Sequence, residues 1–197
     1  INPGESNGSL AVSLPPVSAE VLYTLTVEDS EARRITAQVA VPSTCPYTYF
    51  VSDPDAQRNT CPENDVQTIP LAIQNFERGR MIWISSPQPQ IFALYNDGGL
   101  MMAWDSWNNA PIDYQGISAP DGLLLPERGF GWAWMVVPDI RDRLGFATGP
   151  EQGYSGQVQR VGTFYRGQVT GTTYVTLPDG SIDAIDYMSG ARWRHLP

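Results

Sequence analysis

The side chains best suited to chemistry in this sequence are aromatic. Six tryptophans occur among the 197 residues, and four of them form two close pairs. A flat apolar ring beside hydrogen-bonding side chains can hold a sugar ring or a partner protein. The candidate ligand-binding residues are therefore Trp104, Trp107, Trp132 and Trp134, with Asn108 and Asn109. Packing in the core is the competing interpretation, and in a strand Trp132 and Trp134 would point to the same face.

Nucleophilic catalysis finds little support in the chain. A serine or cysteine hydrolase needs a base that is hydrogen-bonded to its nucleophile. The only histidine, His195, lies two residues before the end, where we expect a fraying tail. All twelve basic residues are arginine, which excludes lysine nucleophiles, Schiff bases and P-loop lysines. We therefore expect no catalytic residues and no enzyme.

Glycoside hydrolysis is the alternative activity, because it needs only a pair of suitably spaced carboxylates. Four glutamates lie in Gly- or Pro-flanked segments near aromatic residues: Glu63, Glu77, Glu127 and Glu151. Surface acids greatly outnumber catalytic ones. We expect Glu77 to form an ion pair with Arg78 instead. Glu127 is expected to pair with Arg128 in the same way.

Neither a metal nor a cofactor is predicted. Asp179, Asp183 and Asp186 lie close together in the sequence, but they lack the D-x-D-x-D-G spacing and the closing Glu of an EF-hand. A turn followed by a solvated strand face accounts for them. Zinc would need more ligands than one histidine and two cysteines that are expected to pair.

The two cysteines, Cys45 and Cys61, are predicted to form a disulfide. Their spacing fits no CxxC metal or redox motif. In the loop-entropy model, closing a loop of about fifteen residues stabilises a fold by about 3 kcal/mol. Such a bond indicates an oxidising compartment, so we expect an extracellular or cell-surface location. A pair of unrelated free thiols is the alternative.

Charge and hydropathy argue against nucleic-acid binding and against a transmembrane segment. The formal net charge is -9 and the pI is about 4.4, so nucleic acid would be repelled. No stretch reaches the ~18 apolar residues of a transmembrane segment, and no signal segment opens the chain. Because Ile1 is not a translation start, we expect a processed or trimmed mature form, from which an anchor could have been lost.

Strands must position these residues, because hydrophobic alternation with a period of two dominates the chain. The fold class we predict is mainly β, with antiparallel hairpins in two related small β units and one short connecting helix. Asn96–Gly99 is a tight-turn signal, and Gly145 ends the helix. The predicted elements are strands at 21–27, 35–41, 76–84 and 90–95, and a helix at 138–144.

The chain is expected to divide into five segments. They are a flexible tether or added strand (1–20), an N-terminal hairpin with the disulfide loop (21–60), a first β unit (61–107), a bridging segment with the short helix (108–148) and a second β unit (149–197). A weak internal repeat relates the units. In it, Pro62-Glu63, Gln74, Gly79, Phe92 and Asp97-Gly98 match Pro150-Glu151, Gln159, Gly162, Tyr174 and Asp179-Gly180.

Several short motifs carry a family resemblance. They are Cys45-Pro46-Tyr47, Cys61-Pro62, Gln74–Gly79, Met81-Ile82-Trp83, Leu94–Gly98, Arg128–Gly131 and Arg143–Gly153. In them the chain resembles uncharacterised secreted proteins and lipoproteins of filamentous green non-sulphur bacteria. Arg143–Gly153 also resembles the LGFP repeat of bacterial cell-wall proteins, with Ala147 in place of its Pro. The resemblance implies an extracellular or envelope setting and no catalytic residue.

These observations predict a non-enzymatic structural or adhesion protein outside the cell, acting as an assembly subunit. Its partners would be other envelope proteins or copies of itself in a filament, and glycans. For assembly, Leu10, Val12 and Leu14 of the first segment could add as a strand to a neighbouring sheet. The alternatives are a carbohydrate-binding module, a glycan-active hydrolase and an accessory subunit on the outer face of a membrane complex.

Overall fold

The computed structural model describes residues 20–29, 31–42, 45–53, 61–85, 88–165, 168–186 and 190–196. In these residues the protein is mainly β, as predicted, with two helices, α2 (Arg128–Val136) and α3 (Pro138–Leu144). The strands are β1 (Glu20–Glu28), β2 (Arg34–Pro42), β3 (Cys61–Pro62), β4 (Gln67–Phe76), β5 (Gly79–Ile84), β6 (Gln90–Tyr95), β7 (Leu100–Trp104), β8 (Gln152–Tyr165), β9 (Gln168–Thr176), β10 (Ile182–Asp186) and β11 (Arg192–Leu196).

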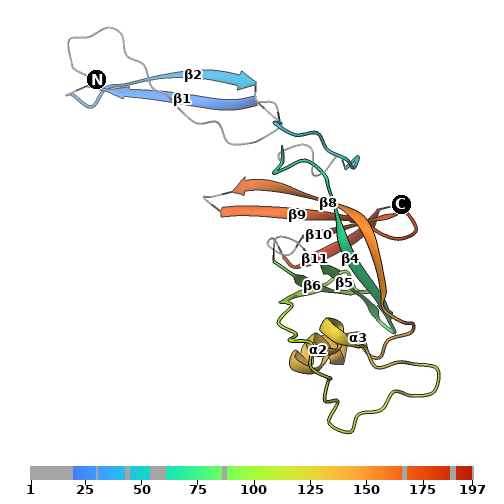
Figure 1. Cartoon of the computed structure of the whole chain (residues 1–197). Helices are drawn as coiled ribbons and strands as arrows, with labels where there is room; N and C mark the ends of the chain where they lie inside the picture. Colours follow the sequence, from blue (N-terminus) through green and yellow to red (C-terminus); the bar gives the residue numbers. More distant parts are fainter. Residues whose placement is uncertain are drawn as a thin grey trace.

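Nine strands form one antiparallel sheet, called the large sheet below (Figure 1). Its order is β11-β10-β9-β8-β4-β5-β6-β7, and β3 pairs with β8. The stretches predicted as separate units are thus two meanders, β4–β7 and β8–β11, joined through β4 and β8. The sheet curls until its two ends meet. Two backbone hydrogen bonds join these ends: the Leu100 N–H donates to the Ala191 carbonyl (3.0 Å), and the Trp193 N–H donates to the Gly98 carbonyl (2.9 Å).

The proposed repeat does not match the structural order of the meanders. The Asp97-Gly98 turn joins β6 to β7, the last two strands of the first meander. The Asp179-Gly180 turn joins β9 to β10, the middle strands of the second meander. Turn residues recur in any β protein, so their similarity follows from local chemistry.

Alternation along the strands creates an inner core. Side chains from both meanders meet inside the curled sheet, since every second residue of a strand points to the same face. The buried members are Leu71, Ile73, Ile82, Ile84, Phe92, Leu94, Leu100, Val158, Val175, Leu177 and Ile185. This core holds the two meanders together.

Two further cores cover the outer face. Phe130 and Trp134 of α2, with Ile140 and Leu144 of α3, pack against strands β4 to β6. Val51 packs against β8 to β10. The segment that carries Val51 is attached by the predicted disulfide, which is present between Cys45 and Cys61 with 5.3 Å between the Cα atoms.

Helix α3 confirms the predicted helix, but α2 corrects a prediction. Trp132 and Trp134 lie in this helix and not in a strand, so their side chains do not share a face. Gly129 and Gly131 lower the helix propensity of this segment, because glycine is a poor helix former, so local propensity does not predict the helix. The helix is instead stabilised by tertiary packing, because it buries Phe130, Ala133 and Trp134.

A turn divides the segment predicted as one strand at 76–84. β4 ends at Phe76 and β5 begins at Gly79, with Glu77 and Arg78 between them. The φ of Gly79 is 153°, and a Cβ there would lie 2.1 Å from the carbonyl oxygen of Leu94. Only glycine fits this approach of two backbones.

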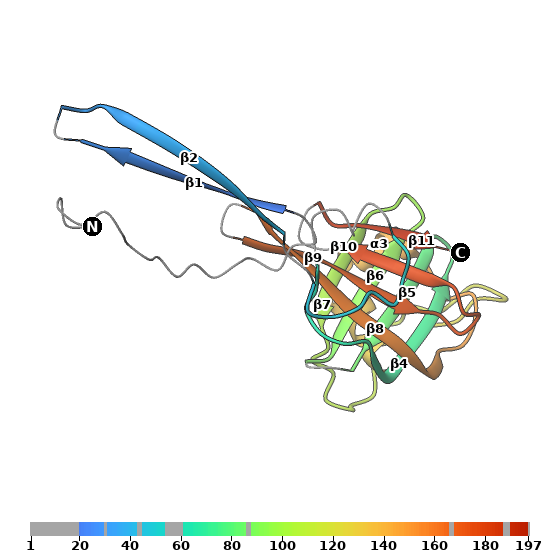
Figure 2. The same cartoon turned by 90° about the horizontal axis from the view of Figure 1, so that it is seen from above.

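The predicted N-terminal hairpin is present as β1 and β2, which form a sheet of their own. This pair, called the ribbon below, projects away from the large sheet in both views (Figures 1 and 2). The predicted added strand at 1–20 falls outside the described residues apart from Glu20, which begins β1.

Candidate functional site

A cleft lies on the outer face of the large sheet, where α2 begins. Its volume is about 280 Å³. We call it the tryptophan cleft, because Trp83 of β5 and Trp107 of the loop after β7 line it. The other lining residues are Leu71, Ala72, Asp105, Arg128, Gly129, Phe130, Glu151 and Gly153. Charged groups and indole rings therefore meet in one concave site.

Asp105 holds the indole of Trp83 and the backbone of Trp107 in place. Its Oδ2 accepts a hydrogen bond from Nε1 of Trp83 (2.8 Å), and its Oδ1 accepts one from the backbone N–H of Trp107 (3.1 Å). Trp107 also donates its own Nε1–H to the carbonyl of Ala110 (2.8 Å). Gly129 makes room for the carboxylate, since a Cβ there would lie 3.1 Å from both oxygens of Asp105.

Arg128 and Glu151 form the charged part of the cleft. Nη1 of Arg128 lies 3.4 Å from Oε1 of Glu151, and the side chain of Arg128 is 67% exposed. Burial raises the pKa of Glu151, although Arg128 opposes this, and the nearby Glu127 and Asp105 raise it further. A donor and an acceptor thus stand side by side, only weakly engaged with each other.

A second pocket adjoins the first. Its volume is about 410 Å³, and it shares Arg128 and Glu151 with the tryptophan cleft. Its own lining adds Gln74, Glu127 and Pro150, and the apolar residues Ala119, Leu123, Leu124 and Leu125. The two pockets form one extended site with the Arg128–Glu151 pair at the junction.

The predicted binding residues are not gathered in this site. Trp107 lines the cleft, but Trp104 is 49% exposed and lines neither pocket. Trp134 is buried and donates its Nε1–H to the Gly145 carbonyl (2.8 Å). Trp132 is partly buried against the helix-side core. Core packing therefore accounts for Trp134.

The two asparagines lie on the exposed loop after Trp107. Oδ1 of Asn108 accepts a hydrogen bond from the Ala110 N–H (3.1 Å), and Asn109 adopts a φ of 65°. Neither lines the extended site. Trp83 and Arg128 do line it, yet the sequence does not single them out, because their partners lie on other elements.

Of the four candidate carboxylates, Glu127 and Glu151 line the extended site. The predicted pair of Glu127 with Arg128 is wrong, since Arg128 faces Glu151. Glu77 accepts a hydrogen bond from the Phe146 N–H (2.8 Å). Its neighbour Arg78 donates to the carbonyls of residues 142 and 143 rather than pairing with Glu77.

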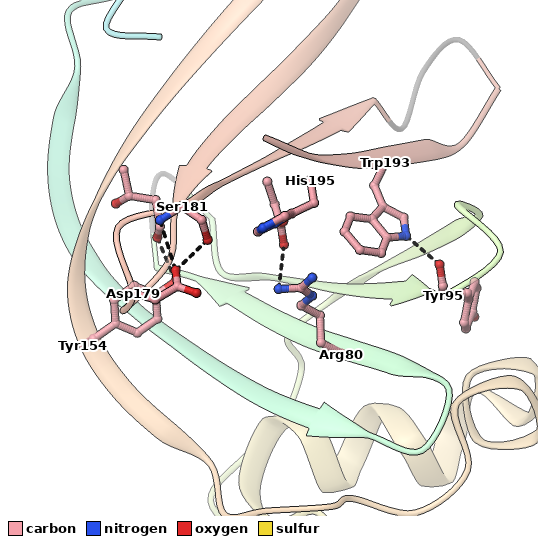
Figure 3. Close-up of polar contacts among 9 residues, drawn as sticks. Arg80, Tyr95, Tyr154, Asp179, Ser181, Trp193 and His195 are labelled. Carbon is pink, nitrogen blue, oxygen red and sulfur yellow. Dashed lines mark hydrogen bonds and ion pairs between the residues drawn. The ribbon is translucent and has the colours of Figure 1, made fainter. Parts of the chain in front are cut away.

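A second polar cluster lies at the inner face of the large sheet. His195 pairs with Asp183 across β10 and β11, and its Nδ1 lies 2.9 Å from Oδ1 of Asp183. Nη1 of Arg80 lies 3.5 Å from the other carboxylate oxygen, and the guanidinium stacks on Trp193 at 4.9 Å. Figure 3 shows Arg80 reaching from β5 toward His195 and Trp193.

This cluster corrects two predictions. His195 belongs to a paired strand and not to a fraying tail. Asp183 is fully buried and not on a solvated face, and burial raises its pKa, although the hydrogen bond to His195 and the charge of Arg80 oppose the shift. Asp179 does lie in an exposed turn, where Ser181 lowers its pKa by hydrogen bonding.

The ribbon presents the third feature, an exposed apolar face. Tyr23 pairs with Val39, Leu25 with Ala37 and Val27 with Ile35 in the antiparallel register, so these side chains share one side. Ile35 is 76% exposed and Val39 58%. Thr24 and Gln38 lie on the opposite face, joined by a side-chain hydrogen bond of 3.2 Å.

The described part of the chain has neither a metal-binding cluster nor a membrane-spanning helix. Among those residues, no group of three His, Cys, Asp or Glu side chains could hold a metal ion. None of the helices in the same part is long and apolar enough to cross a bilayer.

The fold and sites define an antiparallel, disulfide-bonded β protein with a nearly closed sheet, a projecting ribbon and a tryptophan-lined cleft. Comparison of the chain with known protein families, curated proteins and solved structures found no match. The family resemblance stays a prediction.

Proposed function

We propose that the protein is a non-enzymatic structural subunit outside the cell or in its envelope, and that it assembles with copies of itself through the ribbon. The observation that carries this proposal is the exposed apolar face of β1 and β2. The disulfide supports the location, because such bonds persist in oxidising compartments.

The ribbon needs a covering surface for physical reasons. An isolated two-stranded hairpin is at best marginally stable in water. Leu25, Val27 and Ile35 are each more than half exposed, and removing such side chains from water stabilises a protein by ~25 cal/mol per Å². A contiguous exposed apolar face is typical of a protein–protein interface.

A second copy fits this face well. The apolar pairs Tyr23–Val39 and Leu25–Ala37 lie on either side of the central Thr24–Gln38 pair. A twofold axis near this centre would lay one ribbon on another with apolar pairs facing apolar pairs. The acidic and basic side chains at the tip are paired within each copy: Asp29 with Arg33 and Glu28 with Arg34, both at 2.6 Å.

Adjacent residues of β2 give a matched test, because they face opposite sides of the ribbon. Ile35→Glu places a charge on the apolar face, whereas Thr36→Glu places the same charge on the polar face. Light scattering coupled to size exclusion should show an assembly for the unaltered protein and for Thr36→Glu. Ile35→Glu should be monomeric, because a charge buried in an apolar interface is costly.

Two results would contradict the proposal. One is an unaltered protein that stays monomeric at the highest soluble concentration. The other is an Ile35→Glu variant that assembles like the unaltered chain. Near-ultraviolet circular dichroism checks the packing of each variant outside the ribbon, because all six tryptophans lie in the large sheet, in α2 or in the loop after β7.

A further inference from the structure

We propose that the extended site binds a neutral oligosaccharide, with one sugar ring on Trp83 and Trp107 and the next ring in the adjoining pocket. This binding function goes beyond self-assembly and uses a different surface. The tryptophan cleft is lined by the first residues of α2. The ribbon projects from the large sheet at a distance from that helix (Figure 1).

The shape of the site favours a chain of rings. The pockets of about 280 and about 410 Å³ meet at Arg128 and Glu151. Each is near or within the range of ~300–1,000 Å³ that small-molecule sites usually have. A ligand filling both must pass the charged junction, which is where a glycosidic linkage and its neighbouring hydroxyls would lie.

The lining chemistry favours hydroxyl groups at that junction. A sugar hydroxyl both donates and accepts hydrogen bonds. Arg128 offers donors and Glu151 offers acceptors, and their own contact is long at 3.4 Å. A sugar could therefore engage both side chains without leaving either unpaired. The indoles of Trp83 and Trp107 match the apolar C–H face of the ring.

The charge of the site selects against charged ligands. Asp105, Glu127 and Glu151 line the extended site, and the whole protein has a formal net charge of -9. Anionic sugars and nucleotides would therefore be repelled. Arg128 projects from the junction and would repel a quaternary ammonium ion held between the indoles. The charges that line the extended site therefore favour a neutral ligand.

The site is also preorganised. Asp105 accepts hydrogen bonds from the indole N–H of Trp83 and from the backbone N–H of Trp107. The indole N–H of Trp107 donates to the Ala110 carbonyl. A binding surface that is already ordered loses little conformational entropy when the ligand arrives. Asp105 thus acts as a positioning residue whose oxygens are occupied by the tryptophans.

The test is titration of the whole protein with neutral and charged probes, followed by tryptophan fluorescence and calorimetry. The neutral probes are cellotetraose, maltotetraose, mannotetraose and chitotetraose; the charged probes are tetragalacturonate and choline. Saturable binding of at least one neutral probe, with little response to the charged ones, is expected. Binding of none of the neutral probes, or tighter binding of a charged probe, would overturn the proposal.

Two tryptophans close together in the sequence, Trp104 at the end of β7 and Trp107 in the loop after it, provide the matched variants. Trp107→Ala should weaken binding by about tenfold or more, as expected for an aromatic anchor, whereas Trp104→Ala should change it by less than about twofold. Trp104 is the control because it is exposed and lines neither pocket. Equal effects of the two substitutions would contradict the proposed site.

A second variant covers the case in which Trp107→Ala fails to fold. Glu151→Gln keeps the size of the side chain and removes its charge, and it should weaken binding at least about threefold by loss of a charge-assisted hydrogen bond. Unchanged affinity would place the sugar elsewhere. Ile35→Glu should bind as tightly as the unaltered chain, which separates this proposal from assembly.

Discussion

At the residue scale, the most consequential arrangement is a buried carboxylate, Asp183, with an arginine and a histidine beside it. Asp183 has no exposed surface, and Arg80 approaches it from β5. Burying a charge is costly unless a partner compensates it. The raised pKa of Asp183 shows that burial outweighs the help of His195 and Arg80. This cluster ties β10 and β11 to the first meander.

Removing Arg80 should therefore destabilise the protein in a pH-dependent manner. Arg80→Met leaves Asp183 without its guanidinium and should lower the free energy of unfolding by about 3 kcal/mol at neutral pH. The folded pKa of Asp183 lies above its unfolded value of 3.8, so the ionised form opposes folding. The loss should shrink as the pH falls through the raised pKa, because protonation removes the uncompensated charge.

Urea unfolding between pH 4 and 8 measures this effect. Arg33→Met is the control, because Arg33 is 73% exposed at the ribbon tip and should contribute less than about 1 kcal/mol. A loss that stays constant with pH would show that Asp183 is not the group affected by Arg80.

At the element scale, the β4–β5 hairpin depends on one glycine. Gly79→Ala would place a Cβ 2.1 Å from the Leu94 carbonyl oxygen and 2.8 Å from Cδ2 of Leu144. We expect a loss of about 3 kcal/mol or more in the free energy of unfolding, because the backbone at Leu94 and the side chain of Leu144 must both shift. Gly149→Ala, with no atom within 4 Å, should be nearly neutral. Similar unfolding midpoints in urea for the two variants would contradict this account.

The disulfide loop is the second element with a clear role. Its bond spans 16 positions and holds the segment with Val51 and Asp53 against β9, where Asp53 accepts a hydrogen bond from the Tyr174 hydroxyl (2.7 Å). Reduction should lower the free energy of unfolding by about 3 kcal/mol.

Urea unfolding with and without dithiothreitol measures this loss. The Cys45→Ala/Cys61→Ala double variant should show the same lowered stability in both conditions. A reductant effect of equal size in the double variant would mean that something other than the disulfide is being affected.

At the scale of the whole molecule, the large sheet and the ribbon should behave as independent parts. The ribbon forms its own sheet and projects from the rest (Figure 2). Replacing residues 22–40 with a short glycine-serine linker should leave the unfolding of the large sheet within about 0.5 kcal/mol of the monomeric Ile35→Glu variant, because distant sites add independently. Tryptophan fluorescence in urea follows the large sheet with its helices and not the ribbon, which has no tryptophan. A clearly lower stability would show that the ribbon supports the large sheet.

The candidate site could be predicted only in part. The spacing of the tryptophan pairs led to Trp107, and the Gly- and Pro-flanked glutamates included Glu151. Trp83 and Arg128 could not be found in this way, because each meets its partner across more than twenty residues of chain: Trp83 with Asp105, and Arg128 with Glu151. Register and helix placement, which local patterns do not encode, bring them together.

Local chemistry in the sequence determined the strands of the ribbon, the Asn96–Gly99 turn, helix α3 and the disulfide, because alternation, turn residues, helix ends and cysteine spacing act over short distances. The tertiary structure alone decided that two meanders share one curled sheet, that α2 is a helix and that Asp183 is buried beside Arg80. These outcomes depend on burial and on contacts between distant segments, whose free energies outweigh weak local preferences.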